Sequence, residues 1–203
     1  MRFRTLTAVL TGAVAATAFI AGTATSTVAD PASTSRLVLR DGPGDVWKFS
    51  PRTEEQTQVA FPRADVTRAV LRHGPEALTV RMRFVDLEPV GRQLYWVHVR
   101  TPRHQYDAVL NSSPGSRRGS RYFQGDDGSR SCRGFTRHIY YGRDLVTMRV
   151  PRSCVNNPRW VRLGIFNQLS FRAHGPRFFD TPLNHESPAS DATQTRRLYV
   201  SKP

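Results

Sequence analysis

From residue 35 onward the chain alternates apolar and polar side chains, and this pattern predicts β-strands. The clearest case is residues 78–85, where Leu78, Val80, Met82 and Phe84 alternate with polar residues. Successive side chains of a strand point to opposite faces, so this segment has one apolar face and one polar face. Strands are predicted at residues 37–40, 46–49, 66–73, 78–85, 93–100, 104–111, 120–124, 159–167 and 196–201. No segment has the periodicity of an amphipathic helix.

Two of these strands, 66–73 and 78–85, flank a short turn at residues 74–77 and form a predicted hairpin. The expected register places Leu71 opposite Val80 and Asp65 opposite Asp86. The reverse face of the hairpin then carries only polar and basic side chains beside Val70. Its arginines are Arg68, Arg72, Arg81 and Arg83.

A second hairpin is predicted around Gly142, Arg143 and Asp144. A three-residue loop there places Cys132 opposite Cys154, which predicts a disulfide between them. The same register puts His138 and Tyr140 on the apolar face with Val146, Met148 and Val150. Two free buried thiols are the alternative.

Many short strands without helices indicate an all-β fold, a single antiparallel β-sandwich of the immunoglobulin-like or jelly-roll-like kind with one cross-strand disulfide. Residues 111–131 and 172–195 are rich in turn formers and are expected to be loops. There is no internal repeat and no linker, so residues 30–203 are predicted to form one domain.

Residues 1–29 have the features of a secretory signal peptide, namely a basic start, an uncharged stretch and small residues before the first acid. Cleavage is expected between Ala29 and Asp30, with a competing site after Ser26. A permanent membrane anchor is the alternative, but the stretch is only weakly hydrophobic. The protein is therefore expected to be secreted, with no membrane span after cleavage.

The chain has 30 lysines and arginines against 16 acids, a formal charge of +14, and Lys48 and Lys202 are its only lysines. Arginine clusters suit phosphate or sulfate groups. One cluster is the hairpin face of Arg68, Arg72, Arg81 and Arg83. A second lies near Tyr122 and Phe123 and comprises Arg117, Arg118, Arg121, Arg130 and Arg133. The competing interpretation is a solvated surface, because this chain uses arginine almost wherever it carries a cation.

No catalytic motif is present. The chain lacks the Gly-x-Ser-x-Gly elbow, zinc-binding spacings and a phosphate-binding glycine loop. His73 and His138 fall on predicted apolar faces, where hydrogen-bonded structural histidines are expected. Met82 and Met148 are expected to fill the core. We therefore expect a protein without enzymatic activity.

The scarce acids suggest one metal site. Asp41 and Asp45 share a glycine-rich turn, and the predicted pairing of Asp65 with Asp86 brings two like charges together. A Ca²⁺ ion or an arginine would relieve this repulsion. Calcium is the one cofactor the sequence suggests, with ordinary turn-forming aspartates as the alternative.

Three short segments carry a resemblance: Gly44-Asp-Val-Trp47 after Asp41, Ala64-Asp-Val-Thr67, and Val150-Pro-Arg-Ser-Cys154 leading into Trp160. Their order resembles small exported bacterial β-sandwich proteins without assigned activity and, more distantly, family-nine carbohydrate-binding modules and DOMON domains. The carbohydrate-binding relatives imply a sugar held between aromatic rings. The haem-binding DOMON branch implies a methionine and a histidine as iron ligands.

Trp96 and Trp160 lie on the strand faces opposite the apolar stripes and are candidates for sugar stacking; burial under a loop is the alternative. The expected function is a non-catalytic module that binds an extracellular or cell-wall glycan or another anionic polymer, without specific nucleic-acid recognition. A hydrolase with an unrecognised His/Asp site and a structural or inhibitory protein-binding domain are the alternatives. The sequence does not indicate an oligomeric state.

Overall fold

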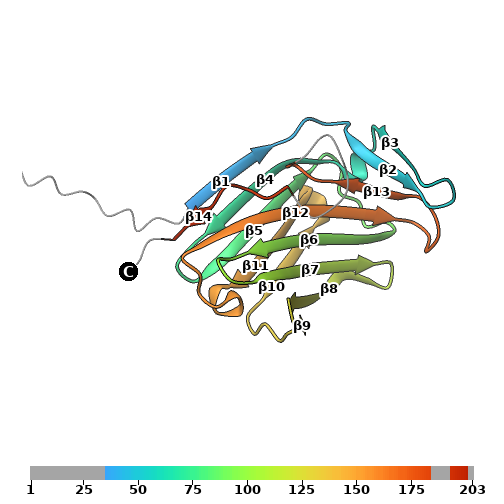
Figure 1. The fold of residues 1–203 in the computed structure, drawn as a ribbon. Coiled ribbons are helices and arrows are strands. Elements are labelled where there is room, and N and C mark those ends of the chain that lie inside the picture. Colours follow the sequence, from blue (N-terminus) through green and yellow to red (C-terminus); the bar gives the residue numbers. More distant parts are fainter. Residues whose placement is uncertain (1–34, 184–192, 201–203) are drawn as a thin grey trace, which may run out of the picture.

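The computed structural model describes residues 35–183 and 193–200, which form two packed antiparallel sheets. Figure 1 shows the two layers, with strands β6, β7 and β12 in front of β5 and β11. The prediction of an all-β sandwich is confirmed.

The first sheet has five strands. In spatial order they are β1 (Ser35–Arg40), β4 (Val66–His73), β5 (Ala77–Phe84), β11 (Leu145–Pro151) and β10 (Thr136–Tyr140). All neighbouring strands in it are antiparallel.

The second sheet has nine strands. Along its main path they are β3 (Glu55–Val59), β2 (Val46–Ser50), β13 (Arg177–Asp180), β12 (Trp160–Ser170), β6 (Arg92–Arg100), β7 (Gln105–Ser113), β8 (Ser116–Gly125) and β9 (Gly128–Ser129), and β14 (Leu198–Tyr199) pairs with β12. Three short 3-10 helices, η1 (Pro62–Ala64), η2 (Tyr141–Arg143) and η3 (Arg152–Val155), lie between strands.

The core fills the space between the two sheets, as the alternating pattern predicts. Leu78, Val80, Met82 and Phe84 of β5 are buried, while Arg81 and Arg83 are exposed. The facing sheet contributes its own alternating set, which includes Tyr95, Val97, Val99, Val161, Leu163 and Ile165. Met82 and Met148 are both buried in this core, so the prediction of their packing role is confirmed.

The register predicted for the β4–β5 hairpin is confirmed over most of its length. Leu71 pairs with Val80 and Arg68 with Arg83. A β-bulge then shifts the pairing by one residue, so that Val66 rather than Thr67 lies opposite Phe84. Beyond it the Val85 amide donates to the Asp65 carbonyl, and the predicted pairing of Asp65 with Asp86 is therefore wrong.

The register predicted for the β10–β11 hairpin is wrong by one residue. The turn is longer than three residues because Tyr141 begins η2, and Asp144 closes the turn in the left-handed conformation. His138 therefore lies opposite Thr147. A one-residue slip turns every side chain of the strand over, so His138 and Tyr140 are exposed and Ile139 faces the core.

The predicted disulfide between Cys132 and Cys154 is nevertheless present. Its cysteines lie beyond the paired ends of the two strands: Cys154 is in η3, after Pro151, and Cys132 precedes β10. The bridge thus closes the open end of the β10–β11 hairpin, where the chain curls away from the ladder.

Strand β8 contains the strand predicted at residues 120–124 but runs from Ser116 to Gly125, inside a segment otherwise expected to be a loop. Strand β13 lies wholly within the other segment expected to be a loop, so that expectation is wrong there. Strand β3 was not predicted either. The side chains of β3 and β8 are mostly exposed and polar, so these strands show little alternation of apolar and polar residues in the sequence. The predicted signal peptide, including Ala29 and Asp30, lies outside the described residues. Within the described part, no helix has the length and apolar character needed to cross a membrane.

Candidate functional site

The outer surface of the five-stranded sheet is strongly basic, and we call it the arginine face. Strand registers bring together arginines from four strands. They are Arg36 and Arg40 of β1, Arg68 and Arg72 of β4, Arg81 and Arg83 of β5, and Arg149 of β11. No acidic residue occupies an outward position on the five strands as described. The four arginines predicted to share a face do so, and three more join them.

Three of these arginines form a row across adjacent strands. Arg40 lies directly opposite Arg68, and Arg68 lies directly opposite Arg83. Neighbouring strands are about 4.8 Å apart, so three like charges stand close together. Like charges directly opposite each other destabilise a sheet, which makes this row costly unless an anion lies over it.

Among the described residues, one ion pair reaches the arginine face. Arg149 forms an ion pair with Glu76 of the β4–β5 turn at 3.0 Å. The Nε atom of Arg68 is buried and has no hydrogen-bond partner among the described residues.

A shallow depression of about 290 Å³ lies in this face. Arg72, Arg81 and Arg149 line one part of it, and His138 and Tyr140 of the edge strand β10 line another. The two rings are stacked, with centroids 5.7 Å apart. The depression therefore offers guanidinium groups beside an aromatic rim.

The second predicted basic cluster does not form a comparable surface. Arg117 donates to the Gly91 carbonyl, and Arg130 forms an ion pair with Asp127. Arg121 lies over the ring of Phe135. These guanidinium groups already have partners, which distinguishes them from the row on the arginine face.

Four aspartates converge where the chain passes between the sheets. Carboxylate oxygens of Asp41, Asp45 and Asp180 lie within 4.8 Å of one another. Asp65 adjoins them, because the Gly44 amide in the turn between Asp41 and Asp45 donates to Asp65 Oδ2 at 2.6 Å. Two of the four predicted calcium ligands, Asp41 and Asp45, therefore lie together with Asp180, a third, Asp65, adjoins them, and Asp180 takes the place assigned to Asp86.

Asp86 is displaced from the aspartate cluster by the bulge, and its amide donates to the Pro62 carbonyl. Burial raises the pKa of Asp180 to about 8, assisted by the nearby carboxylates Asp41, Asp45 and Asp65, although the Val66 amide donates to it. Burial likewise raises the pKa of Asp65. Both shifts arise chiefly from the loss of water around a buried carboxylate, and neighbouring negative charges add to them.

The outer surface of the nine-stranded sheet carries a row of aromatic side chains as well as arginines, among them Arg100, which lies directly opposite Arg162. Trp96 pairs with Phe166 and Val109, and Val109 pairs with Tyr122. Phe179 adjoins Phe166 at 5.4 Å and pairs with Trp47. We call this row, from Tyr122 through Trp96, Phe166 and Phe179 to Trp47, the aromatic band.

Trp160 does not belong to the aromatic band. The register places it six residues from Phe166 along β12, which is roughly 20 Å from Trp96. The guanidinium of Arg197 also covers its ring at 4.6 Å. The two tryptophans predicted to stack on a sugar therefore cannot act as one platform.

The best candidate for acid–base chemistry is the pair of His98 and Asp107. Nδ1 of His98 is 2.7 Å from Asp107 Oδ1, and Nε2 is 3.0 Å from Gln105 Oε1. Burial disfavours the Asp107 carboxylate, but hydrogen bonds from His98, Gln124 and Trp96 outweigh it and hold the pKa of Asp107 below its usual range. Both ring nitrogens of His98 thus face neighbours in the sheet.

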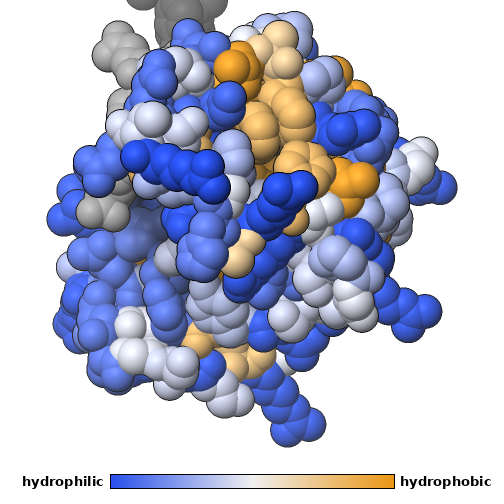
Figure 2. Space-filling view, turned by 90° about the vertical axis from the view of Figure 1, so that its right-hand side faces the viewer, coloured by the Kyte–Doolittle hydropathy of each residue, from blue (hydrophilic) through white to orange (hydrophobic). Residues whose placement is uncertain are grey.

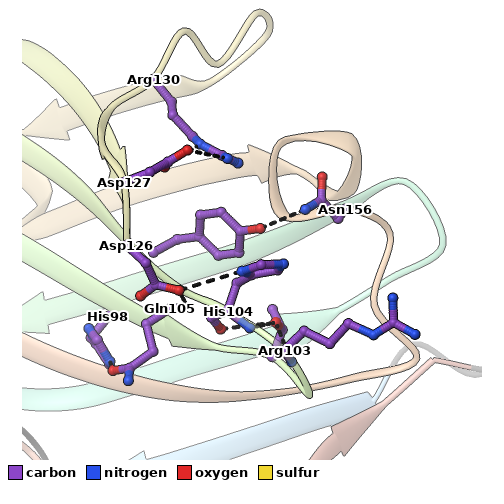
Figure 3. Close-up of polar contacts among 10 residues, drawn as sticks. His98, Arg103, His104, Gln105, Asp126, Asp127, Arg130 and Asn156 are labelled. Atoms are coloured by element: carbon purple, nitrogen blue, oxygen red, sulfur yellow. Dashed lines mark hydrogen bonds and ion pairs between the residues drawn. The ribbon is translucent and has the colours of Figure 1, made fainter.

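Figure 3 shows the polar contacts at the adjoining end of the sheet. His104 and Asp126 form an exposed ion pair at 3.5 Å, and Asn156 donates to the hydroxyl of Tyr106. These contacts tie the β6–β7 and β8–β9 turns together. These contacts have a structural role, and no catalytic role is needed to explain them.

Figure 2 shows an apolar patch surrounded by hydrophilic side chains at the end of the sandwich near β2, β3 and β13. Phe61 and Phe178 are stacked there with ring centroids 4.0 Å apart, and Phe171 packs edge-on to both. Phe171 remains 48% exposed. Of these rings only Phe178 lies in a segment expected to be a loop, and Phe61 and Phe171 lie outside the predicted strands, so the cluster was not predicted.

The chain matches no protein-family model, no curated protein and no solved structure. Its function must therefore be inferred from its own residues, and the arginine face, the aspartate cluster and the aromatic band are the features that could carry one.

Proposed function

We propose that this protein is an exported, non-catalytic module that binds an anionic polymer through the arginine face. The observation that carries the proposal is the row of Arg40, Arg68 and Arg83, which lie directly opposite one another without an acid between them. Such a row disfavours the empty fold and favours a bound polyanion.

The chemistry of the guanidinium group supports this choice of ligand. Arginine binds phosphate and sulfate through paired hydrogen bonds, a geometry that lysine cannot match. A polymer binds several arginines at once and releases its condensed counterions, which makes binding tight at low salt. The rim of His138 and Tyr140 could stack on rings that alternate with the anionic groups.

The hydrolase alternative has weaker support. A general base needs a nitrogen that can reach the substrate proton. In the pair of His98 and Asp107, both imidazole nitrogens already face oxygen atoms of the sheet.

Retention on immobilised heparin tests the proposal. One variant changes Arg68, Arg72, Arg81 and Arg83 to glutamine, which removes the charges and keeps most of each side-chain stem. It should elute at a clearly lower salt concentration than the unchanged protein, because the guanidinium groups that hold the polymer are gone.

A matched variant controls for net charge. It changes Arg52, Arg103, Arg118 and Arg172, which are exposed and lie outside the arginine face, to glutamine. We expect it to elute much closer to the unchanged protein, with both variants folded by circular dichroism. Equal reductions in the two variants would mean that binding follows total charge, and the proposal would be dropped.

The aromatic band favours a second candidate function, the binding of a neutral glycan. Tyr122 is 41% exposed, and its row continues through Trp96 to Phe166 across three further strands. Affinity electrophoresis in gels containing neutral polysaccharides tests this candidate. Trp96→Ala should abolish retardation while Trp160→Ala leaves it, and unretarded wild-type protein would reject the candidate.

Export is a separate part of the proposal and rests on the sequence of residues 1–29 together with the disulfide between Cys132 and Cys154. Disulfides persist mainly in oxidising compartments. N-terminal sequencing of protein from the culture medium should give Asp30 as the first residue. Cell-bound protein that retains Met1 would contradict it.

A further inference from the structure

We propose that one Ca²⁺ ion binds between the carboxylates of Asp41, Asp45 and Asp180, beside the adjoining carboxylate of Asp65. Asp41 and Asp45 flank the turn from β1 to β2, Asp65 precedes β4, and Asp180 ends β13. Strands β1 and β4 belong to one sheet and β2 and β13 to the other. The site therefore lies where the chain crosses between the sheets.

The spacing of the oxygen atoms suits one calcium ion. Ca²⁺ holds its oxygen ligands at about 2.3–2.6 Å, so ligands on opposite sides of the ion are roughly 5 Å apart. Oxygens of Asp41, Asp45 and Asp180 all lie within 4.8 Å of one another. They thus span a single coordination sphere.

Asp65 provides a second, independent indication of a ligand. It is only 2% exposed, and its Oδ1 atom is buried without a hydrogen-bond partner in the described part of the chain. Its other oxygen accepts from the Gly44 amide, which directs the carboxylate toward the turn between Asp41 and Asp45. A buried acceptor without a donor is unfavourable, and a cation in the cluster would satisfy it.

The donor set selects calcium among the common metals. All four side chains offer carboxylate oxygens, whereas zinc sites usually contain histidine or cysteine. Ca²⁺ accepts irregular loops and completes its shell with backbone carbonyls or water, while Mg²⁺ demands a near-octahedral site. Four of the 16 acids of this basic chain are gathered here, so the cluster stands out against the composition.

A bound ion would tie the two sheets together at one end. Asp65 and Asp180 are already linked to this corner, because Val66 next to Asp65 donates its amide to Asp180. The ion would add the β1–β2 turn to the same point. We therefore expect its main effect to be on the stability of the fold.

Thermal unfolding of the purified protein tests the inference. Samples treated with EDTA and then dialysed are compared in CaCl₂, MgCl₂ and NaCl at equal ionic strength. Calcium at about a hundred times its Kd should raise Tm by roughly 5–10 °C, and magnesium by much less. Terbium luminescence should saturate at one ion per chain and be reversed by added Ca²⁺.

Two variants and a control locate the site. Asp180→Asn should abolish the calcium-dependent rise in Tm, and Asp45→Asn, at a half-buried position, provides the same test if the first variant fails to fold. Asp86→Asn should keep the full rise, because Asp86 lies outside the cluster. The same Tm in CaCl₂ and EDTA, or loss of the rise in Asp86→Asn, would overturn the inference.

Discussion

The two outer faces of the sandwich differ in how their charged side chains are partnered. On the nine-stranded sheet, Asp107 accepts hydrogen bonds from His98 and Gln124, so its charge has partners. On the five-stranded sheet, Arg40, Arg68 and Arg83 face one another without an acid. Polar groups with hydrogen-bond partners stabilise a fold, whereas like charges without a counter-charge can bind an ion of opposite charge. Arg100 also lies opposite Arg162 on the nine-stranded sheet, but the row of arginines on the five-stranded sheet is longer and crosses three strands. This difference points to the arginine face as the surface that binds a partner.

The largest expected loss of stability comes from the core beneath the arginine face. It is the reference for the smaller changes expected on the two outer faces. Phe84→Ala should lower the free energy of unfolding by about 3–5 kcal/mol, because Phe84 is buried against Tyr95 of the opposite sheet. Denaturant unfolding measures it. If Arg83→Ala were the more damaging change, the inner and outer sides of β5 would be misassigned.

The disulfide comes next, because it closes the end of the hairpin that carries the aromatic rim of the arginine face. Replacing Cys132 and Cys154 by serine should cost about 3 kcal/mol, from the entropy gained by the unfolded chain. The variant is compared with the oxidised wild type by guanidinium unfolding. No loss of stability would mean that the bridge closes an already ordered segment.

A smaller loss of stability is expected on the outer face of the nine-stranded sheet, where the polar groups of the Asp107 network have partners. Asp107→Ala leaves the donors of His98 and Gln124 without their acceptor and should cost about 1–3 kcal/mol at pH 7. Because the folded pKa of Asp107 lies below its unfolded value, the contribution of the ionised carboxylate is present at neutral pH. It disappears as pH falls through the folded pKa.

Unfolding at pH 7 and at pH 3 checks that prediction, with Glu55→Ala at an exposed position of β3 as the control. A loss no larger than that of the control at pH 7 would show that the Asp107 network adds nothing to stability.

The smallest effect should have the opposite sign. Arg83→Gln relieves the repulsion from Arg68 and should raise the free energy of unfolding by about 0.2–0.5 kcal/mol at low salt. The gain should vanish at high salt, where the charges are screened. A clear destabilisation at low salt would mean that Arg83 stabilises the fold, against the contrast between the two faces.

Local pairing could be predicted from the sequence, and pairing between distant segments could not. The β4–β5 register follows from a short turn and one alternating stripe, up to the bulge at Val66. The β10–β11 register failed because the left-handed Asp144 lengthened the turn by one residue. No local sequence pattern predicted the left-handed conformation of Asp144.

The candidate sites follow the same division. Arg68 and Arg81 were placed on one face because they belong to one hairpin, whereas Arg40 and Arg149 joined it through strands that are distant in the sequence. Asp180 was missed for the same reason. It is the last residue of an unpredicted strand and accepts a hydrogen bond from the Val66 amide, 114 residues away in the sequence.

The salt dependence of polymer binding tests the central claim most directly. The association constant for a defined heparin fragment is measured between about 50 and 300 mM NaCl for the unchanged protein and for both quadruple variants. For each sulfate that an arginine no longer neutralises, the slope of log K against log salt should become shallower by nearly one. We predict a markedly shallower slope when Arg68, Arg72, Arg81 and Arg83 are neutralised and little change when Arg52, Arg103, Arg118 and Arg172 are. Equal slopes for the two variants would contradict the assignment of binding to the arginine face.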